Sequence, residues 1–310
     1  METRNPNTAT LSAEPQFYVW DGHRCAYEVC RPENASGMPI VSLHPIGVGL
    51  TRQFWARFSR EWCDRGYRNP LYHPDLLGNG DSDLPCLPYS PTDWAAQIAR
   101  FIETEIGEPV VLLSQGASFP IAVELAKAHS DRINAIVLSG PPAWGVMTQA
   151  ANPTQQNLNW KLFFNTILGS WFYRYARTDG FLRSFSIKQL FDKADDVDRE
   201  WMEMLRAHSR DIDTRHAVLS FLAGFWRRDY TEDLESLTQP TLAIFGEGAS
   251  SISKRGKTDP AEKRVKDYLA YIPHAQAQIV PGRNVLPYES TTEFVEATAA
   301  FFGRQNLLAK

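Results

Sequence analysis

Short apolar runs recur along the chain, with helical patterns between them. The runs are too short to be helices and do not alternate with polar residues, which is typical of strands covered on both faces. They comprise residues 39–43, 109–113, 133–138, 241–245 and 277–280. Two further strands are predicted at residues 16–20 and 24–30, separated by the turn signal Asp21-Gly22.

Two of the intervening segments gather large apolar side chains on one helical face. One face carries Phe54, Trp55, Phe58 and Trp62, and the other carries Trp94, Ile98, Phe101 and Ile102. Strands that alternate with such helices predict an α/β fold, with a mostly parallel sheet flanked by helices.

The alternation stops at residues 143–229, which hold 15 of the 37 aromatic residues of the chain. This stretch is predicted to be a helical insertion over the sheet. Its aromatic side chains either form a core for the insertion or line a ligand cavity, because aromatic residues are common in both.

Composition narrows the possible partners and the location. The net charge is −4 and no long run of like charge occurs, which argues against nucleic acid or a polybasic membrane anchor as partner. Four cysteines are too few for a disulfide framework, and the polar N-terminal segment lacks the apolar stretch of a secretory signal. No eighteen apolar residues follow one another, so no transmembrane segment is expected. We therefore expect a cytoplasmic protein.

Neither a metal site nor a cofactor site is expected. No pair of cysteines has zinc-finger spacing with nearby histidines. The turn Gly78-Asn79-Gly80 lacks the third glycine and the following helix of a dinucleotide-binding motif. Small molecules and proteins remain as possible partners.

Two motifs, in order and correctly spaced, resemble those of the α/β-hydrolase superfamily. Residues 43–47, Leu-His-Pro-Ile-Gly, resemble the oxyanion loop after the third strand, and residues 74–82 resemble the Asp-x-x-Gly-x-Gly-x-Ser stretch after the fourth. The resemblance implies an eight-stranded, mostly parallel sheet. It also implies a core of residues 16–142 and 230–303 and a helical cap of residues 143–229. The polar composition of the first fifteen residues predicts a disordered tail at 1–15, and a C-terminal tail is expected at 304–310.

The resemblance places the nucleophile elbow, Gly-x-Ser-x-Gly in the family, at residues 114–118. These residues read Ser-Gln-Gly-Ala-Ser, so Gly116 stands where the nucleophile is expected. Glycine suits the turn because it adopts positive φ without strain, but it has no reactive atom. A register shifted by two residues would instead make Ser118 the nucleophile.

The other two triad positions also lack reactive groups. The segment 281–287 resembles the family motif that carries the catalytic histidine, and it has Val285 at that position, whereas the last histidine of the chain is His274. The segment Gly246-Glu247-Gly248-Ala249 has alanine where the family has its acid. We expect no catalytic residue at Gly116, Ala249 or Val285, a degenerate triad typical of a pseudoenzyme.

Several groups at the same place remain available for binding. The resemblance implies that the backbone N–H groups of Ile46 and of Ala117, where we expect the next helix to start, can form an oxyanion hole. Gln115 offers a side-chain amide. Gly116, Val285 and Trp144, the last at the start of the insertion, complete the candidate ligand-binding set.

Three functions are consistent with this pattern. The first is a non-catalytic protein that binds a small apolar or amphipathic molecule, or a protein partner, under an aromatic lid. The second is an enzyme, either a hydrolase of the esterase type with a relocated nucleophile such as Ser118 or a lyase that uses His44. The third is a structural module whose cleft is filled by Trp144, Trp160, Trp171 and Phe164. His44 and Asp75 follow two neighbouring strands, where we expect them to brace loops.

Overall fold

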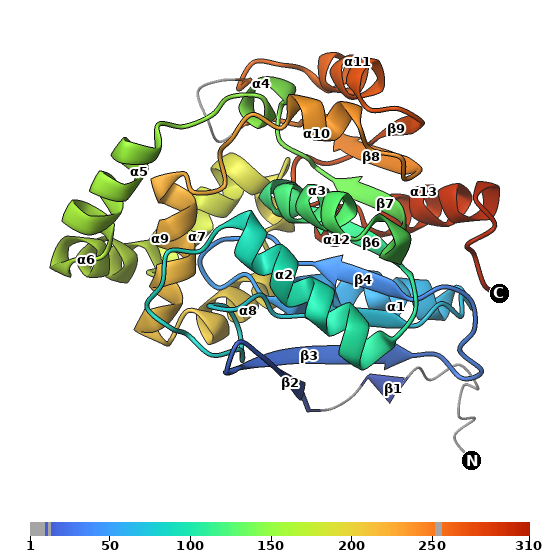
Figure 1. The fold of residues 1–310 in the computed structure, drawn as a ribbon, viewed down its shortest axis with the longest axis horizontal. Helices are drawn as coiled ribbons and strands as arrows, with labels where there is room; N and C mark the ends of the chain where they lie inside the picture. Colours follow the sequence, from blue (N-terminus) through green and yellow to red (C-terminus); the bar gives the residue numbers. More distant parts are fainter. Residues whose placement is uncertain (1–9, 12–13, 252–255) are drawn as a thin grey trace.

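The computed structural model describes residues 10–11, 14–251 and 256–310. Within these residues one sheet runs in the order β1-β3-β5-β4-β6-β7-β8-β9, and β2 pairs with β3 beside it (Figure 1). The strands are β1 (Thr10–Leu11), β2 (Gln16–Trp20), β3 (His23–Arg31), β4 (Ile40–Leu43), β5 (Leu71–Pro74), β6 (Val110–Gln115), β7 (Ile133–Ser139), β8 (Thr241–Gly246) and β9 (Ala275–Val280). Pairing is antiparallel for β1, β2 and β5 against β3 and parallel from β5 through β4 to β9.

The predicted α/β architecture with a mostly parallel sheet is confirmed. The two-residue strand β1, where Thr10 is paired with Arg31, adds a ninth strand to the eight expected. The rest of the expected N-terminal tail up to residue 13 lies outside the described residues. The apolar runs do not predict strand β5, because its sequence is Leu-Tyr-His-Pro. All four of its residues are nevertheless buried.

Side chains of the central strands point alternately into two hydrophobic clusters, one on each face of the sheet. In β6, Leu112 belongs to the first cluster, whereas Val111 and Leu113 belong to the second. Phe101 of α2 (Pro91–Phe101) and Phe119 of α3 (Phe119–Ala128) belong to the first cluster. This burial on both faces explains why the strands read as continuous apolar runs.

Helices outside residues 143–229 cover the two faces of the sheet (Figure 1). They are η1 (Arg52–Trp55), α1 (Ala56–Asp64), α2 (Pro91–Phe101), η2 (Ile102–Ile106), η3 (Gly116–Ser118), α3 (Phe119–Ala128), η4 (Ser130–Arg132), α10 (Thr231–Glu235), α11 (Ala261–Tyr271), α12 (Leu286–Glu289) and α13 (Thr291–Arg304). The residues after α13 pack back on the core, since Ala309 N–H donates to Asn69 Oδ1 at 3.0 Å.

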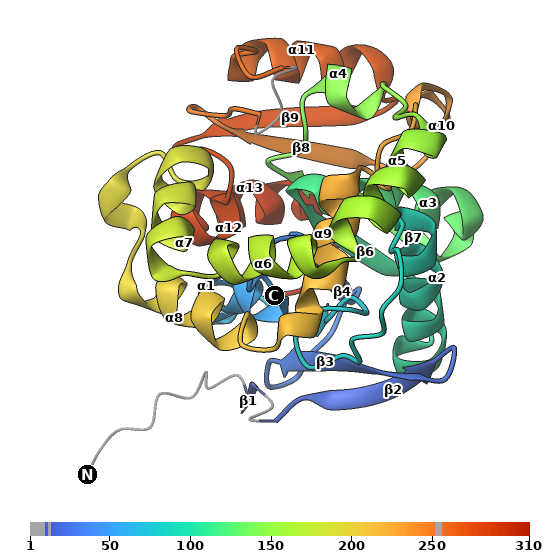
Figure 2. The ribbon, with the colours of Figure 1, turned by 90° about the vertical axis from the view of Figure 1, so that its left-hand side faces the viewer.

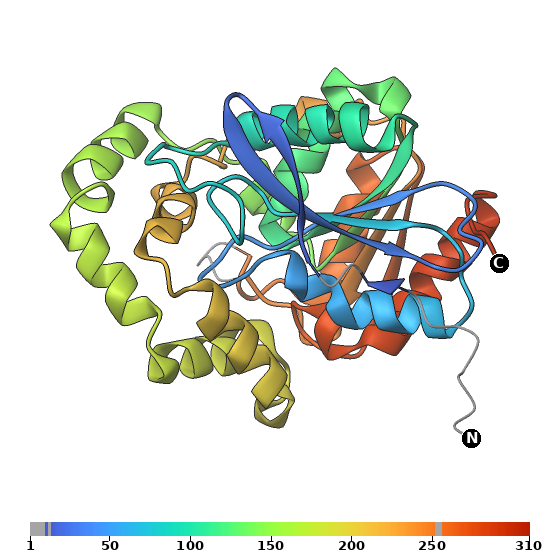
Figure 3. The same cartoon turned by 90° about the horizontal axis from the view of Figure 1, so that it is seen from below.

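Residues 143–229, between β7 and β8, are mostly helical. All of these helices except the first, which lies beside α11, lie together at one end of the molecule (Figures 1 and 3). The helices are α4 (Trp144–Met147), α5 (Pro153–Asn159), η5 (Trp160–Phe164), α6 (Ile167–Ala176), α7 (Asp179–Phe185), η6 (Ser186–Leu190), η7 (Ala194–Asp196), α8 (Arg199–His208), η8 (Ile212–Thr214) and α9 (Arg215–Ala223). We refer to residues 143–229 as the cap.

The cap contacts loops that follow the carboxyl ends of strands. Ser220 Oγ of α9 accepts from Tyr89 N–H at 3.0 Å, in the segment after β5. Leu190 O of η6 accepts from Asn284 N–H at 3.0 Å, in the loop after β9. The cap therefore lies over the edge of the sheet where open α/β sheets bind ligands (Figure 2).

Candidate functional site

The order in which strands are added to the sheet reverses at β4, whose two parallel neighbours are β5 on one side and β6 on the other. Loops from the two sides separate at such a switch point and leave a crevice at the carboxyl ends of the strands. The segment that contains Ile46 follows β4, and Gly116 follows β6. The topology thus brings the expected oxyanion loop and the elbow to the same edge.

Gly116 forms the turn between β6 and the helix that follows. Its φ is +57°, in the left-handed region that glycine occupies without strain. A Cβ atom built on Gly116 would find no atom closer than Gly140 O, at 4.0 Å. One turn of 3-10 helix, η3, precedes α3, which begins at Phe119 rather than at Ala117 as expected. The crest of this turn therefore has room for a side chain and carries none.

Ser118 lies below the crest and is fully buried. Its Oγ lies 3.0 Å from Ser114 Oγ, accepts from Gln115 N–H at 3.1 Å and donates to Gln115 O at 2.9 Å. These contacts tie the end of β6 to the start of α3. In this geometry the two serines hold the strand-to-helix turn together.

Asn284 connects three loops and the cap. Its backbone O accepts from Gln115 Nε2 at 2.6 Å, next to the elbow. Its Nδ2 donates to Ser250 O at 3.1 Å, in the loop after β8, and to Gln189 O at 2.7 Å, in the cap. The loops that contain Gln115, Ala249 and Val285 are therefore adjacent in space, as the resemblance implies.

The side chains at positions 249 and 285 carry no polar group. Val285 is 2 % exposed and belongs to the second hydrophobic cluster, and Ala249 is partly exposed. The neighbouring positions also approach closely: a Cβ on Gly140 would lie 2.7 Å from Asn284 O. This corner of the site is held by backbone contacts and by the Asn284 amide.

The remaining candidate ligand-binding residues are only partly brought together. Ile46 is buried in the first hydrophobic cluster, against which Ala117 packs with its side chain half-buried. The Oε1 of Gln115 is buried and has no hydrogen-bond partner in the described part of the chain. Trp144 is stacked on Tyr271 of α11, with ring centroids 4.6 Å apart and an interplanar angle of 8°. Its ring thus packs between α4 and α11.

The aromatic residues considered as cleft fillers also lie elsewhere. Trp171 is 72 % exposed on α6, and Trp160 packs with Leu219 and Ala223 inside the cap. The cap therefore has a small apolar core of its own, as one of the two readings of its aromatic content predicted.

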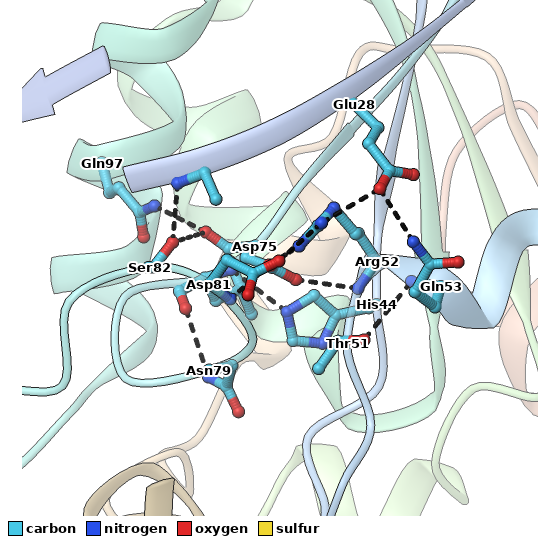
Figure 4. A network of polar contacts seen from close by, with 12 residues as sticks. Glu28, His44, Thr51, Arg52, Gln53, Asp75, Asn79, Asp81, Ser82 and Gln97 are labelled. Atoms are coloured by element: carbon cyan, nitrogen blue, oxygen red, sulfur yellow. Dashed lines mark hydrogen bonds and ion pairs between the residues drawn. The ribbon is translucent and has the colours of Figure 1, made fainter. Parts of the chain in front are cut away.

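A buried network of charges holds the loops after β4 and β5 (Figure 4). Arg52, 3 % exposed, forms ion pairs with the carboxylates of Asp75, Glu28 and Asp81, the latter two at 3.0 and 2.7 Å. Burial alone would lower the pKa of Arg52, but the three carboxylates hold it above its ordinary value. Asp75 Oδ2 also accepts from Asp81 N–H at 3.0 Å. Sequence reasoning missed Arg52, because its three partners are distant in the sequence.

His44 braces the same loops. Its Nδ1 lies 2.8 Å from Pro45 O, and its Nε2 lies 3.1 Å from Leu76 N, which can only donate. The proton is thereby assigned to Nδ1 and both ring nitrogens are occupied. Burial lowers the pKa of His44, which favours the neutral ring. Asp75 and His44 thus have the bracing contacts expected of them, and no free base for a lyase reaction is left at His44.

No helix in residues 10–11, 14–251 and 256–310 is long and apolar enough to cross a bilayer. In the same residues, no group of three or more His, Cys, Asp or Glu side chains has a spacing that would hold a metal ion.

The sequence profile described as "Alpha/beta hydrolase family" matches residues 40–297, most of the chain. The chain belongs to the alpha/beta hydrolase family. No curated protein matches the sequence.

Solved structures of other proteins share the alpha/beta hydrolase fold with this family member. A thermophilic esterase from Thermogutta terrifontis has a TM-score of 0.71 at 18% identity, over 94% of this chain and 99% of its own. A bromoperoxidase from Bacillus anthracis has a TM-score of 0.70 at 19% identity, over 94% and 100%. An esterase from Exiguobacterium antarcticum has a TM-score of 0.70 at 18% identity, over 96% and 100%. At these identities the likeness concerns the fold.

Proposed function

We propose that this alpha/beta hydrolase family member is a non-catalytic protein that binds a small apolar or amphipathic molecule at the switch point under its cap. The observation that carries the proposal is Gly116, which has a left-handed backbone and open space where the family has its nucleophile. Ala249 and Val285 at the other two triad positions can neither donate nor accept a proton. The proposal keeps the division into a core of residues 16–142 and 230–303 and a cap of residues 143–229.

The groups that remain favour a ligand with an oxygen at one end. The first N–H groups of a helix have no partner within the helix, so Ala117 and the neighbouring loop of Ile46 can offer donors to a carbonyl or carboxylate. Gln115 Nε2 is held by Asn284 O, so the amide oxygen Oε1 is the acceptor left for a hydroxyl or amine on the ligand. A buried polar atom without a partner costs about 1–3 kcal/mol, and a ligand donor would remove that cost.

The alternative, an esterase with Ser118 as nucleophile, has weaker support. Ser118 Oγ is fully buried, and its hydrogen-bond partners are Ser114 and backbone groups of Gln115 and Leu43. An activated serine needs a general base within hydrogen-bond reach, and none of these groups is one.

We propose a cytoplasmic location for the protein, as its sequence composition indicates.

Fluorophosphonate labelling, run beside an ester panel, tests the absence of a nucleophile. We expect no serine of this protein to be modified under conditions that label a control esterase fully. Stoichiometric labelling of Ser118, with ester turnover that is lost in Ser118→Ala, would instead establish the esterase. Slow background turnover decides nothing, because binding and electrostatic effects alone leave about 10³–10⁴-fold catalysis over water when a triad is removed.

Native mass spectrometry of the purified protein tests the binding role. We expect a small molecule to co-purify and to be lost in Gly116→Asn, whose side chain would occupy the open crest while tolerating the left-handed backbone. Gly66→Asn is the matched control. Gly66 has a φ of +78° and its Cβ would also meet nothing within 4 Å, but it lies in the turn after α1. Equal ligand loss in both variants, or no bound molecule in the wild type, would contradict the proposal.

A further inference from the structure

The cap exposes many large apolar side chains. Of thirteen large hydrophobic residues that are exposed in the described part of the chain, seven fall between residues 158 and 175. We call these seven the cap patch: Leu158, Leu162, Phe163, Ile167, Leu168, Trp171 and Tyr175. They belong to α5, η5 and α6, which project at the end of the molecule away from the C-terminus (Figures 1 and 3).

Helix α6 is apolar on the side that faces away from the protein. Ile167, Trp171 and Tyr175 follow one another at i, i+4 and i+8 and are 76, 72 and 61 % exposed. The opposite side carries Gly169 and Tyr173, which are buried. A surface helix ordinarily shows charged and polar residues on its outer face. The outer face of α6 therefore exposes apolar surface that a binding partner would bury.

The cap patch rests on a well-packed support. Tyr173 Oη lies 2.6 Å from Thr214 Oγ1, which fixes α6 to the segment before α9. A Cβ on Gly169 would lie 2.0 Å from Phe164 O, so the turn between η5 and α6 can close only with glycine there. Trp160 points inward against Leu219. The exposed side chains are therefore presented by a defined helical hairpin.

The segment that carries the cap patch has a positive net charge, although the chain as a whole is negative; Asp179 and Asp213 lie on α7 and η8, which pack against α6. Residues 148–178 contain Lys161, Arg174 and Arg177 and no Asp or Glu, whereas the net charge of the protein is −4. Lys161 and Arg174 are exposed beside the apolar side chains. The three cations are scattered rather than consecutive, so the sequence shows no polybasic run. Lys161 and Arg174 are the two that are exposed, whereas Arg177 Nη1 donates to Ser209 O and Arg210 O.

We propose that the cap patch docks on the surface of a bilayer that contains anionic lipids. Tryptophan and tyrosine are the residues enriched at membrane–water interfaces, and a helix that lies in this interface combines such residues with lysine and arginine. The local positive charge complements anionic headgroups and would repel a protein partner of like charge. Docking would hold the cap, and the switch point beneath it, against the lipid. This inference does not depend on the proposed ligand-binding role.

Vesicle flotation tests the docking with the full-length protein. The vesicles are phosphatidylcholine alone or an equal mixture with phosphatidylserine. We expect the wild type to float with the mixed vesicles, and Ile167→Ser/Trp171→Ser to lose at least about tenfold in partitioning, since two large apolar side chains no longer bury. The matched control is Val19→Ser/Leu269→Ser, which removes two exposed side chains outside the cap and should float like the wild type.

A charge variant tests whether the binding depends on the anionic lipid. Lys161→Glu/Arg174→Glu should weaken binding to the mixed vesicles and leave the weaker binding to phosphatidylcholine unchanged. A wild type that floats with neither vesicle, or a serine double variant that floats as well as the wild type, would overturn the proposal. So would concentration-dependent self-association without vesicle binding that disappears in Ile167→Ser/Trp171→Ser, because the cap patch would then join two copies of the chain.

Discussion

Two glycines at the candidate site have similar φ angles but differ in the space around them. Gly116 has a φ of +57° and Gly140 a φ of +51°, both in the left-handed region. A Cβ on Gly116 would lie 4.0 Å from its nearest neighbour, whereas a Cβ on Gly140 would lie 2.7 Å from Asn284 O. Replacing each by alanine therefore measures how open the crest of the elbow is, with the backbone cost held constant.

The expected losses follow from these distances. Left-handed backbone costs a non-glycine residue about 1–2 kcal/mol, and alanine recovers about 0.4–1 kcal/mol by restricting the unfolded chain. Gly116→Ala should thus lower the free energy of unfolding by about 1 kcal/mol. In Gly140→Ala the carbonyl of Asn284 must also move, which breaks its 2.6 Å hydrogen bond with Gln115 Nε2. That disruption adds about 1–3 kcal/mol and brings the loss to about 2–4 kcal/mol.

Urea unfolding, followed by tryptophan fluorescence, measures both losses. The midpoint should fall more in Gly140→Ala than in Gly116→Ala, with an unchanged slope m in both variants. A loss in Gly116→Ala as large as that in Gly140→Ala would refute the reasoning. It would mean that protein atoms fill the crest, and no ligand could then be received there.

Two further predictions concern the buried groups around the site. Asp75→Asn should lower the free energy of unfolding by about 3 kcal/mol, because it removes one partner of buried Arg52. The control is Glu103→Gln, in the exposed ion pair with Arg100, which should lower it by less than about 1 kcal/mol. Equal losses in the two variants would contradict the burial of Arg52 and Asp75. Burial lowers the pKa of His73 to about 3, and the nearby charge of Arg52 contributes to this shift. Below pH 6.5 the His73 ring is therefore protonated in the unfolded chain but stays neutral in the folded protein. The wild type should therefore lose about 2 kcal/mol more than His73→Gln between pH 6.5 and 5, and parallel pH profiles in urea unfolding would show that the ring is not buried as described.

The sequence was sufficient to predict the sheet and the elbow because both depend on local patterns. Residues 109–113 form an apolar run, and β6 occupies Val110–Gln115, with Gly116 at the turn that follows. Alignment with the family then placed the left-handed position at a glycine, which is the residue that this backbone favours. The start of α3 was two residues in error, because a 3-10 turn and an α-helix have the same local preferences.

The contacts that hold the site could not be predicted in the same way. Arg52 lies at the start of η1 and reads as an ordinary charge on a helix, yet its partners come from β3 and from the loop after β5. The aromatic content of the cap does not indicate which way its side chains point. Only one of the three functions considered placed Trp171 in the cleft, and Trp171 lies 72 % exposed on the outer surface. Periodicity predicts that a helix has an apolar face, and here α6 has apolar residues on both sides.

Asn284 connects the elbow, the loop after β8 and the cap. In an active member of the fold, a hydrogen-bonded chain of serine, histidine and acid links the elbow to two loops. In this protein the backbone O of Asn284 contacts Gln115 beside the elbow. Its side chain contacts Ser250 in the loop after β8 and Gln189 in the cap. Neutral amide contacts of this kind do not titrate near neutral pH. Under the proposed binding role they hold the three loops and the cap in place independently of any histidine or acid, and a fixed set of loops is what a binding protein requires of its site.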